Sequence, residues 1–308
     1  MEELTLLGER AVQAKYELQR MTTEKKNEVL EAVAEALIQN TEYLLLENHK
    51  DLERGIANQM NPGLVDRLRL TKERIAGMAE GIRQIVKLPD PVGEILDDYE
   101  AENGLHIVKK RVPMGVIGII YESRPNVTAD AFGLCFKSGS AVILRGGSDA
   151  IRSNMAITKV IQDAVVRKGV DPYVIQLIES TDRSVVNEFM KMKQYVDLLI
   201  PRGGAGLIRN VIENSLIPVI ETGTGNCHIY VDETADFEMA LNIIENAKTS
   251  RPSVCNAEEV LLVHSAVAEK FLPLLQKKLV EERKEKGEIP VELRLCDRAA
   301  KIISGTLA

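Results

Sequence analysis

A thiol and a carboxylate stand in settings that suit acyl chemistry. Cys255 lies in the polar, small-residue loop 250–255, which follows a helical pattern, and Glu221 ends the short apolar run 217–220 just before Gly223. A lone Cys is more often a small buried residue, but a thiol in such a loop is a candidate nucleophile. Arg251, four positions before Cys255, can stabilise a thiolate or bind a substrate carboxylate or phosphate. The pattern predicts covalent catalysis through Cys255, with Arg251 and Ser253 in the same loop as candidate substrate-binding residues.

Two glycine turns after apolar runs are candidate phosphate sites. The run 141–144 ends in Arg145, Gly146, Gly147 and Ser148 just before a helical pattern, and 201–206 repeats the design with Gly203 and Gly204. An Arg beside backbone N–H groups at a helix start can bind phosphate, although a charged residue beside a glycine turn is the plainer interpretation. Neither turn matches Gly-x-Gly-x-x-Gly or a P-loop. The sequence therefore predicts a nucleotide site without the usual fingerprint.

The elements that must position these residues follow from periodicity. Apolar runs at 115–121, 141–144, 174–178, 196–200 and 217–220 alternate with helical stretches. This alternation is typical of a parallel sheet covered on both faces, with ligands at the carboxyl ends of its strands. Residues 1–88 have helical spacing, and 94–112 reads as an exposed β-hairpin with a turn at Asn103 and Gly104. We expect a nucleotide-binding domain at 1–226 and a second α/β domain at 227–308.

Composition narrows the functional class. The 308 residues are 45% hydrophobic and carry a net charge of -7, with basic residues interspersed among acidic ones. This predicts a globular protein that does not bind nucleic acid. The N-terminus lacks a basic leader and no apolar run approaches the roughly 20 residues of a membrane span, so we expect a cytoplasmic protein with no membrane partner. The 4 Cys and 4 His show no ligand spacing, and no metal site is expected.

Several strings resemble the aldehyde dehydrogenase superfamily, and most closely its gamma-glutamyl phosphate reductase branch. They are Tyr-Glu-Ser-Arg-Pro-Asn at 121–126, Glu-Thr-Gly-Thr-Gly-Asn-Cys-His at 221–228, and the Cys255 loop at the matching interval. The resemblance implies an aldehyde dehydrogenase-like α/β fold. It also implies NADPH-dependent reduction of L-glutamate 5-phosphate to glutamate 5-semialdehyde in proline biosynthesis, with Cys255 as the nucleophile.

The same resemblance suggests roles for other residues. Arg145 stands where the superfamily has a Lys that contacts the adenosine ribose, and Ser148 stands where it has a ribose-binding Glu. Loss of that carboxylate beside an Arg favours NADP(H) over NAD(H). Glu221 corresponds to the superfamily's general base, and in an acyl phosphate reductase it can instead position groups. Asn126 corresponds to an oxyanion-hole amide, whereas Arg124 is a candidate for the substrate carboxylate.

Family members of this type continue beyond position 308, which predicts a partial catalytic domain here and a homo-oligomer only with a complete tail. Two alternatives remain at this level. One is a catalytically silent homologue that binds nucleotide or subunits through the first domain and the 94–112 hairpin. The other is an aldehyde-oxidising dehydrogenase in which Glu221 activates water.

Overall fold

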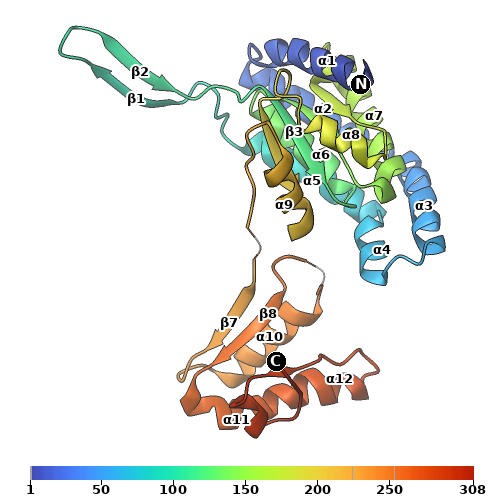
Figure 1. Cartoon of the computed structure of the whole chain (residues 1–308), viewed down its shortest axis with the longest axis vertical. Coiled ribbons are helices and arrows are strands. Elements are labelled where there is room, and N and C mark those ends of the chain that lie inside the picture. Colours follow the sequence, from blue (N-terminus) through green and yellow to red (C-terminus); the bar gives the residue numbers. More distant parts are fainter. Residues whose placement is uncertain (1, 224, 253) are drawn as a thin grey trace. The chain divides into compact units, whose positions relative to one another are not determined.

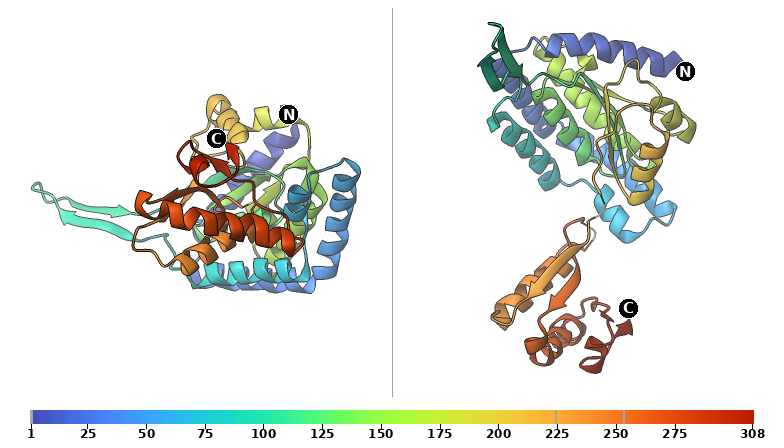
Figure 2. Two further views of the ribbon diagram at one scale, coloured as in Figure 1. Left: turned by 90° about the horizontal axis from the view of Figure 1, so that it is seen from below. Right: turned by 60° about the vertical axis from the view of Figure 1, so that its left-hand side comes forward.

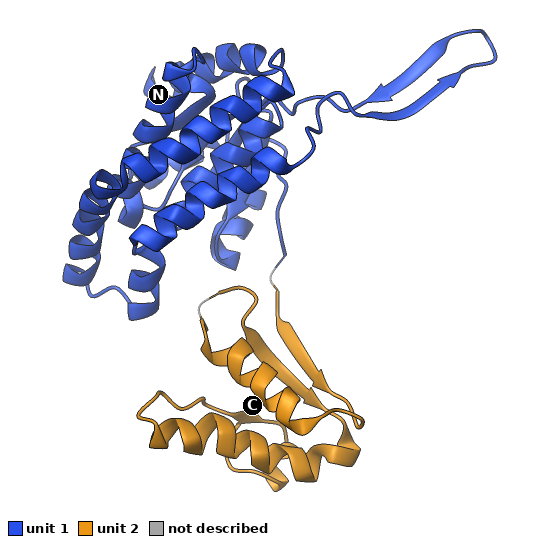
Figure 3. Ribbon diagram, turned by 180° about the vertical axis from the view of Figure 1, so that it is seen from behind, with its two compact units in different colours: residues 1–223 blue, residues 224–308 orange. Residues whose placement is uncertain are grey.

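The structure, a computed structural model, describes residues 2–223, 225–252 and 254–308. It divides into two compact units, residues 1–223 and 224–308, which Figure 3 colours separately. None of the helices in the described ranges has the length and apolar composition that a membrane crossing requires.

Unit 1 begins with helices that polar residues cap. They are α1 (Glu2–Leu18), α2 (Thr23–Gln39), α3 (Thr41–Ala57), α4 (Pro62–Leu68) and α5 (Lys72–Lys87). The side chains of Thr22, Asn61 and Thr71 accept backbone N–H groups at the starts of α2, α4 and α5. Each cap satisfies a donor that the first helical turn leaves without an intrahelical partner. The predicted helical front end is therefore confirmed.

A parallel sheet forms the centre of unit 1. Its strands are β3 (Val116–Tyr121), β4 (Ala141–Arg145), β5 (Ile175–Leu177) and β6 (Leu198–Arg202), in the order β5-β4-β3-β6. The predicted run 217–220 adds only an isolated bridge between Leu199 and Val219. Pro218 lacks the N–H that a longer ladder would need, so the expectation of a full strand there was wrong.

Helices cover both faces of this sheet (Figures 1 and 2). The connecting helices are α6 (Asn126–Lys137), α7 (Ile151–Arg167), α8 (Arg183–Phe189) and α9 (Ala205–Asn214), with short 3-10 turns η1 (Ser148–Ala150) and η2 (Pro172–Val174). α6 and α7 pack beneath α2, α3 and α5, whereas α1 packs on β4 and β3. Every residue of β3 is buried, as expected for a strand covered on both sides. The predicted doubly covered α/β sheet is confirmed.

The hairpin of β1 (Ile95–Glu100) and β2 (His106–Lys110) projects from the rest of unit 1 (Figure 1). Its strands are antiparallel and all their residues are exposed. Gly104 has φ of 83°, and the loop closes with the Ala101 N–H donating to the Leu105 carbonyl at 2.8 Å. The turn is thus longer than a two-residue Asn-Gly turn, with Gly104 supplying the left-handed conformation.

Unit 2 is a smaller α/β assembly. Its elements are β7 (Cys227–Val231), α10 (Phe237–Thr249), β8 (Glu258–Val263), α11 (Ser265–Gln276), a π-helical stretch η3 (Lys277–Glu281), α12 (Glu282–Glu285), β9 (Arg294–Leu295), η4 (Ala299–Lys301) and β10 (Thr306–Leu307). β7 pairs in parallel with β8, and β9 with β10. Phe271, Ile244 and Val231 lie at the centre of its hydrophobic core. The apolar and polar residues alternate at 291–294, but of these four only Arg294 belongs to a strand, β9.

Candidate cofactor and catalytic sites

A cavity of about 640 Å³ lies at the carboxyl ends of the strands in unit 1. Its walls come from the ends of β3 and β4, from the segment after β5, and from α8 and α9. The chain connections on the two sides of β3 run in opposite directions along the sheet. Ligands of open α/β sheets bind at such a switch point, and we call this space the sheet-end cavity.

Arg145 faces this cavity at the end of β4. Its guanidinium donates to the Gly146 carbonyl at 2.7 Å and to the Thr181 carbonyl at 3.2 Å, which fixes its direction. Its Nε is buried and has no hydrogen-bond partner in the described part of the chain. Burial and the nearby charge of Arg183 lower the pKa of Arg145. Two guanidinium groups that repel each other across one cavity favour an anion between them.

The glycines after β4 leave room for close backbone approach. A Cβ atom on Gly147 would lie 2.8 Å from the Ser123 Oγ, and one on Gly146 would collide with the buried Asn154 amide. Asn154 belongs to a buried network in which the Thr128 hydroxyl accepts from the Tyr121 hydroxyl at 2.7 Å and donates to the Asn154 side-chain oxygen at 3.1 Å. Only glycine fits these two positions, so the turn that carries Arg145 keeps its shape.

α3 holds this turn from outside the sheet. Arg54 donates to the carbonyls of Ser148 and Asp149 at 2.9 and 3.0 Å. Asp51, whose side chain is fully buried, accepts from the Ser153 N–H at 2.8 Å and from the Ser153 hydroxyl at 2.7 Å. Asp51 therefore caps the start of α7 from another helix. Together Asp51 and Arg54 fix the segment between Arg145 and α7.

The second glycine turn already has a ligand within the chain. The Gly204 N–H, at the start of α9, donates to the Glu122 carboxylate at 2.8 Å. A Cβ on Gly203 would lie 2.7 Å from the same carboxyl carbon. The carboxylate of Glu122 thus takes the position that the sequence suggested for a phosphate, and Gly204 is open to an anion only when Glu122 moves aside.

The residues after β3 lie near the cavity but differ in setting. Asn126 is exposed at the first position of α6 and donates to Asp130 at 3.0 Å. Arg124 is half-buried in the preceding turn, where its N–H donates to the Glu122 carbonyl at 2.7 Å. The amide of Asn126 is therefore engaged by a carboxylate on its own helix.

Cys255 occupies an exposed turn just before β8. Its carbonyl accepts from the Cys227 thiol at 3.3 Å, which joins the turn to the start of β7. Arg251 is exposed after α10, and Ser253 lies outside the described residues. Sequence reasoning missed Glu258, the buried first residue of β8. Burial raises its pKa against the opposing effects of Lys248 and His228.

The other cysteines differ from Cys255 in ways that matter for reactivity. Cys135 is buried in α6, which raises the pKa of its thiol to about 12. Cys296 is exposed, and the backbone N–H groups of Ala299 and Arg298 lower the pKa of its thiol.

Glu221 and Gly223 are exposed at the end of unit 1, whereas Cys255 belongs to unit 2. Across the described ranges, His, Cys, Asp and Glu side chains form no group of three or more suited to a metal ion.

The fold and these sites define a class of protein. The sequence model of the Aldehyde dehydrogenase family matches residues 2–288, and the chain belongs to that family. Gamma-glutamyl phosphate reductase from Clostridium botulinum (strain Eklund 17B / Type B) is 53% identical over 303 residues, which cover 98% of this chain and 72% of that protein. The enzyme of the same name from Lachnospira eligens is 56% identical over 285 residues, which cover 92% of this chain and 69% of that protein. Within the family, the chain groups with the gamma-glutamyl phosphate reductases.

A comparison with solved structures leads to the same group of proteins. The crystal structure of gamma-glutamyl phosphate reductase from Thermotoga maritima superposes with a TM-score of 0.86 at 43% identity, covering 99% of this chain and 72% of that one. The chain therefore spans about 70% of the length of these relatives. The aldehyde dehydrogenase-like fold expected from the sequence is confirmed.

Proposed function

We propose that this chain reduces L-glutamate 5-phosphate to L-glutamate 5-semialdehyde and phosphate in proline biosynthesis, with NADPH as the electron donor. The identity of 53% to a gamma-glutamyl phosphate reductase over 98% of the chain carries this proposal. The exposed Cys255 turn and the arginine-lined sheet-end cavity support it, because the reaction needs a nucleophile and a dinucleotide site.

In unit 2 the Cys255 thiolate attacks the acyl carbonyl, the carbonyl–phosphate bond breaks and phosphate leaves, which forms a thioester. After reduction, the carbon–sulfur bond of the thiohemiacetal breaks, which releases the aldehyde and regenerates the Cys255 thiolate. Arg251, four residues earlier, can receive the phosphate or the substrate carboxylate. Asn126 and Glu221 remain proposed catalytic groups, and Ser253 and Arg124 remain proposed substrate-binding residues.

In unit 1 the sheet-end cavity suits NADP(H). The buried unpaired Nε of Arg145 and the charge of Arg183 fit a phosphate group, and the absence of a Cβ at Gly147 lets Ser123 pack against the same turn. Arg145, Gly146, Gly147 and Ser148 would hold the adenosine end, with Gly203, Gly204 and Gly223 as further proposed contacts. When bound, the cofactor supplies the hydride.

The reverse reaction tests the function. We expect purified protein to reduce NADP in the presence of glutamate 5-semialdehyde only when inorganic phosphate is added, since phosphate must attack the thioester. NADP reduction that continues without phosphate would assign the chain to aldehyde oxidation. A folded protein that binds NADP without any turnover would instead indicate a silent homologue.

A carboxylate at position 148 should change cofactor preference. Ser148 lines the sheet-end cavity, and a negative charge there would repel a 2′-phosphate while accepting a ribose hydroxyl. We expect Ser148→Glu to raise the KM for NADPH by about tenfold or more, a change of about 1.4 kcal/mol, and to leave that for NADH unchanged or lower. Ser148→Gln is the uncharged control. If Ser148→Glu and Ser148→Gln changed the KM values for NADPH and NADH equally, the assignment of Ser148 to the 2′-phosphate site would be contradicted.

A further inference from the structure

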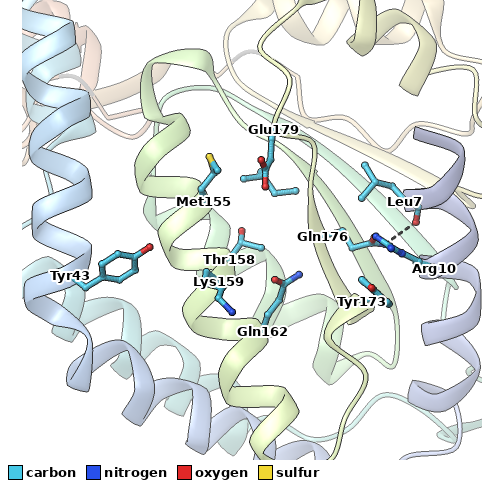
Figure 4. A pocket seen from close by; sticks show the side chains of 11 residues that line it. Leu7, Arg10, Tyr43, Met155, Thr158, Lys159, Gln162, Tyr173, Gln176 and Glu179 are labelled. Atoms are coloured by element: carbon cyan, nitrogen blue, oxygen red, sulfur yellow. Dashed lines mark hydrogen bonds between the residues drawn. The ribbon is translucent and has the colours of Figure 1, made fainter. Parts of the chain in front are cut away.

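A second cavity, of about 420 Å³, opens between α1, α3, α7 and the edge strand β5 (Figure 4). We call it the α7 cavity. Among the described residues it shares no lining residue with the sheet-end cavity, and the reaction proposed above uses none of its side chains. Its volume falls within the range of about 300–1,000 Å³ that is usual for small-molecule sites.

The inner wall of this cavity contains two polar side chains whose oxygens lack partners. Gln176 of β5 is 2% exposed and Thr158 of α7 is 5% exposed. The Gln176 Nε2 donates to the Leu7 carbonyl at 2.8 Å, which leaves the Oε1 as the free end of the amide. Its Oε1 and the Thr158 Oγ1 have no hydrogen-bond partner in the part of the chain that the structure describes. Leaving such an atom unpaired costs about 1–3 kcal/mol, so the wall favours a ligand that satisfies both.

The chemistry of these two atoms specifies one end of the ligand. The Gln176 oxygen can only accept a hydrogen bond, whereas the Thr158 hydroxyl can donate one or accept one. A primary amide offers an N–H₂ donor beside a carbonyl acceptor, which complements this pair. A carboxylate would present no donor to Gln176, and an aliphatic group would leave both oxygens unpaired.

The outer part of the cavity contains opposite charges that do not pair with each other. The Arg10 guanidinium lies over the Tyr173 ring at 4.4 Å from its centroid, and Glu179 lines the same cavity with an exposed side chain. Figure 4 places Arg10 and Glu179 at different points around the opening. Within residues 2–223, no ion pair joins Arg10 to a carboxylate. A small zwitterion would neutralise both groups, whereas Glu179 would repel a nucleotide phosphate.

We propose that the α7 cavity binds a free α-amino acid that has a side-chain amide. Its carboxylate would lie at Arg10 and its ammonium group at Glu179. The side-chain amide would reach inward, donating to Gln176 and accepting from Thr158 after a small rotation of these side chains. The apolar carbons would pack on Leu177 and Met155, which also line the cavity. The proposal does not depend on the catalytic function of the chain.

Calorimetric titration of the complete 308-residue protein with L-glutamine tests this site. We expect saturable binding of one molecule per chain, and L-glutamate should bind at least about tenfold more weakly because it lacks the inward N–H donor. Thr158→Val keeps the side-chain shape but removes the hydroxyl, and Arg10→Gln removes the outer charge. Each should weaken glutamine binding about tenfold. Arg20→Gln, an exposed position just after α1, is the matched control and should bind as the parent protein does.

Two results would overturn the proposal. One is the lack of saturable L-glutamine binding to protein whose circular dichroism shows it to be folded. The other is binding that Thr158→Val and Arg10→Gln leave unchanged, which would place the amino acid elsewhere, including at the substrate site. Cys255→Ser distinguishes this proposal from the catalytic one, because it should abolish turnover while leaving glutamine binding intact. Thr158→Val should instead weaken glutamine binding and leave turnover intact.

Discussion

Replacing Cys255 with Ser should abolish the reductase reaction. We expect turnover to fall at least about a thousandfold, because the hydroxyl is a far weaker nucleophile than a thiolate. The measurement is phosphate-dependent reduction of NADP with glutamate 5-semialdehyde. NADP binding should be unchanged, since Arg145 and the sheet-end cavity belong to unit 1.

The other cysteines provide the controls for this experiment. Cys227→Ser tests the neighbour whose thiol donates to the Cys255 carbonyl, and we expect it to retain most activity. Cys296 is exposed and its thiol has a lowered pKa, so alkylating reagents should modify it readily without affecting turnover. Labelling studies therefore require the Cys296→Ser background. Full activity in Cys255→Ser would remove this residue from the mechanism.

Replacing Asp51 with Ala should strongly destabilise unit 1. The side chain is fully buried, and its loss leaves the Ser153 N–H and hydroxyl without an acceptor at the start of α7. We expect a cost of about 3–5 kcal/mol in the free energy of unfolding, measured by urea denaturation with circular dichroism. Asp51→Asn retains an acceptor and should cost less. Any folded Asp51→Ala protein should also bind NADPH more weakly, because Arg54 loses the partner that orients it toward Ser148.

Glu188→Ala is the comparison for this effect. Glu188 pairs with Lys191 at 3.0 Å, and their side chains are 43% and 52% exposed. Such a surface pair contributes at most about 1 kcal/mol, so the unfolding midpoint should change little. If Asp51→Ala and Glu188→Ala unfolded at the same urea concentration, the proposed cap of α7 would not contribute to stability.

Strands and turns that depend on the local pattern of apolar residues and glycines were predictable from the sequence. The buried strand β3 and its partners β4, β5 and β6 appear as mainly apolar runs, because a strand covered on both faces places both sets of its side chains in the core. Pro218 shows the limit of this pattern, since the run 217–220 is apolar enough for a strand but lacks a donor for the ladder. The exposed hairpin and the turn carrying Arg145 were likewise visible, because their glycines serve local backbone needs.

The settings of particular side chains depended on contacts between distant segments. Arg183 joins Arg145 in one cavity only because the segment after β5 lies beside the end of β4. Asp51 caps α7 from α3. The Glu122 carboxylate accepts a hydrogen bond from the Gly204 N–H, which the sequence had predicted to bind a phosphate. Such contacts have no sequence period, since packing brings the partners together. The sequence by itself thus determined the family, the sheet and the candidate nucleophile, whereas the tertiary structure decided which charges and buried polar atoms share a cavity.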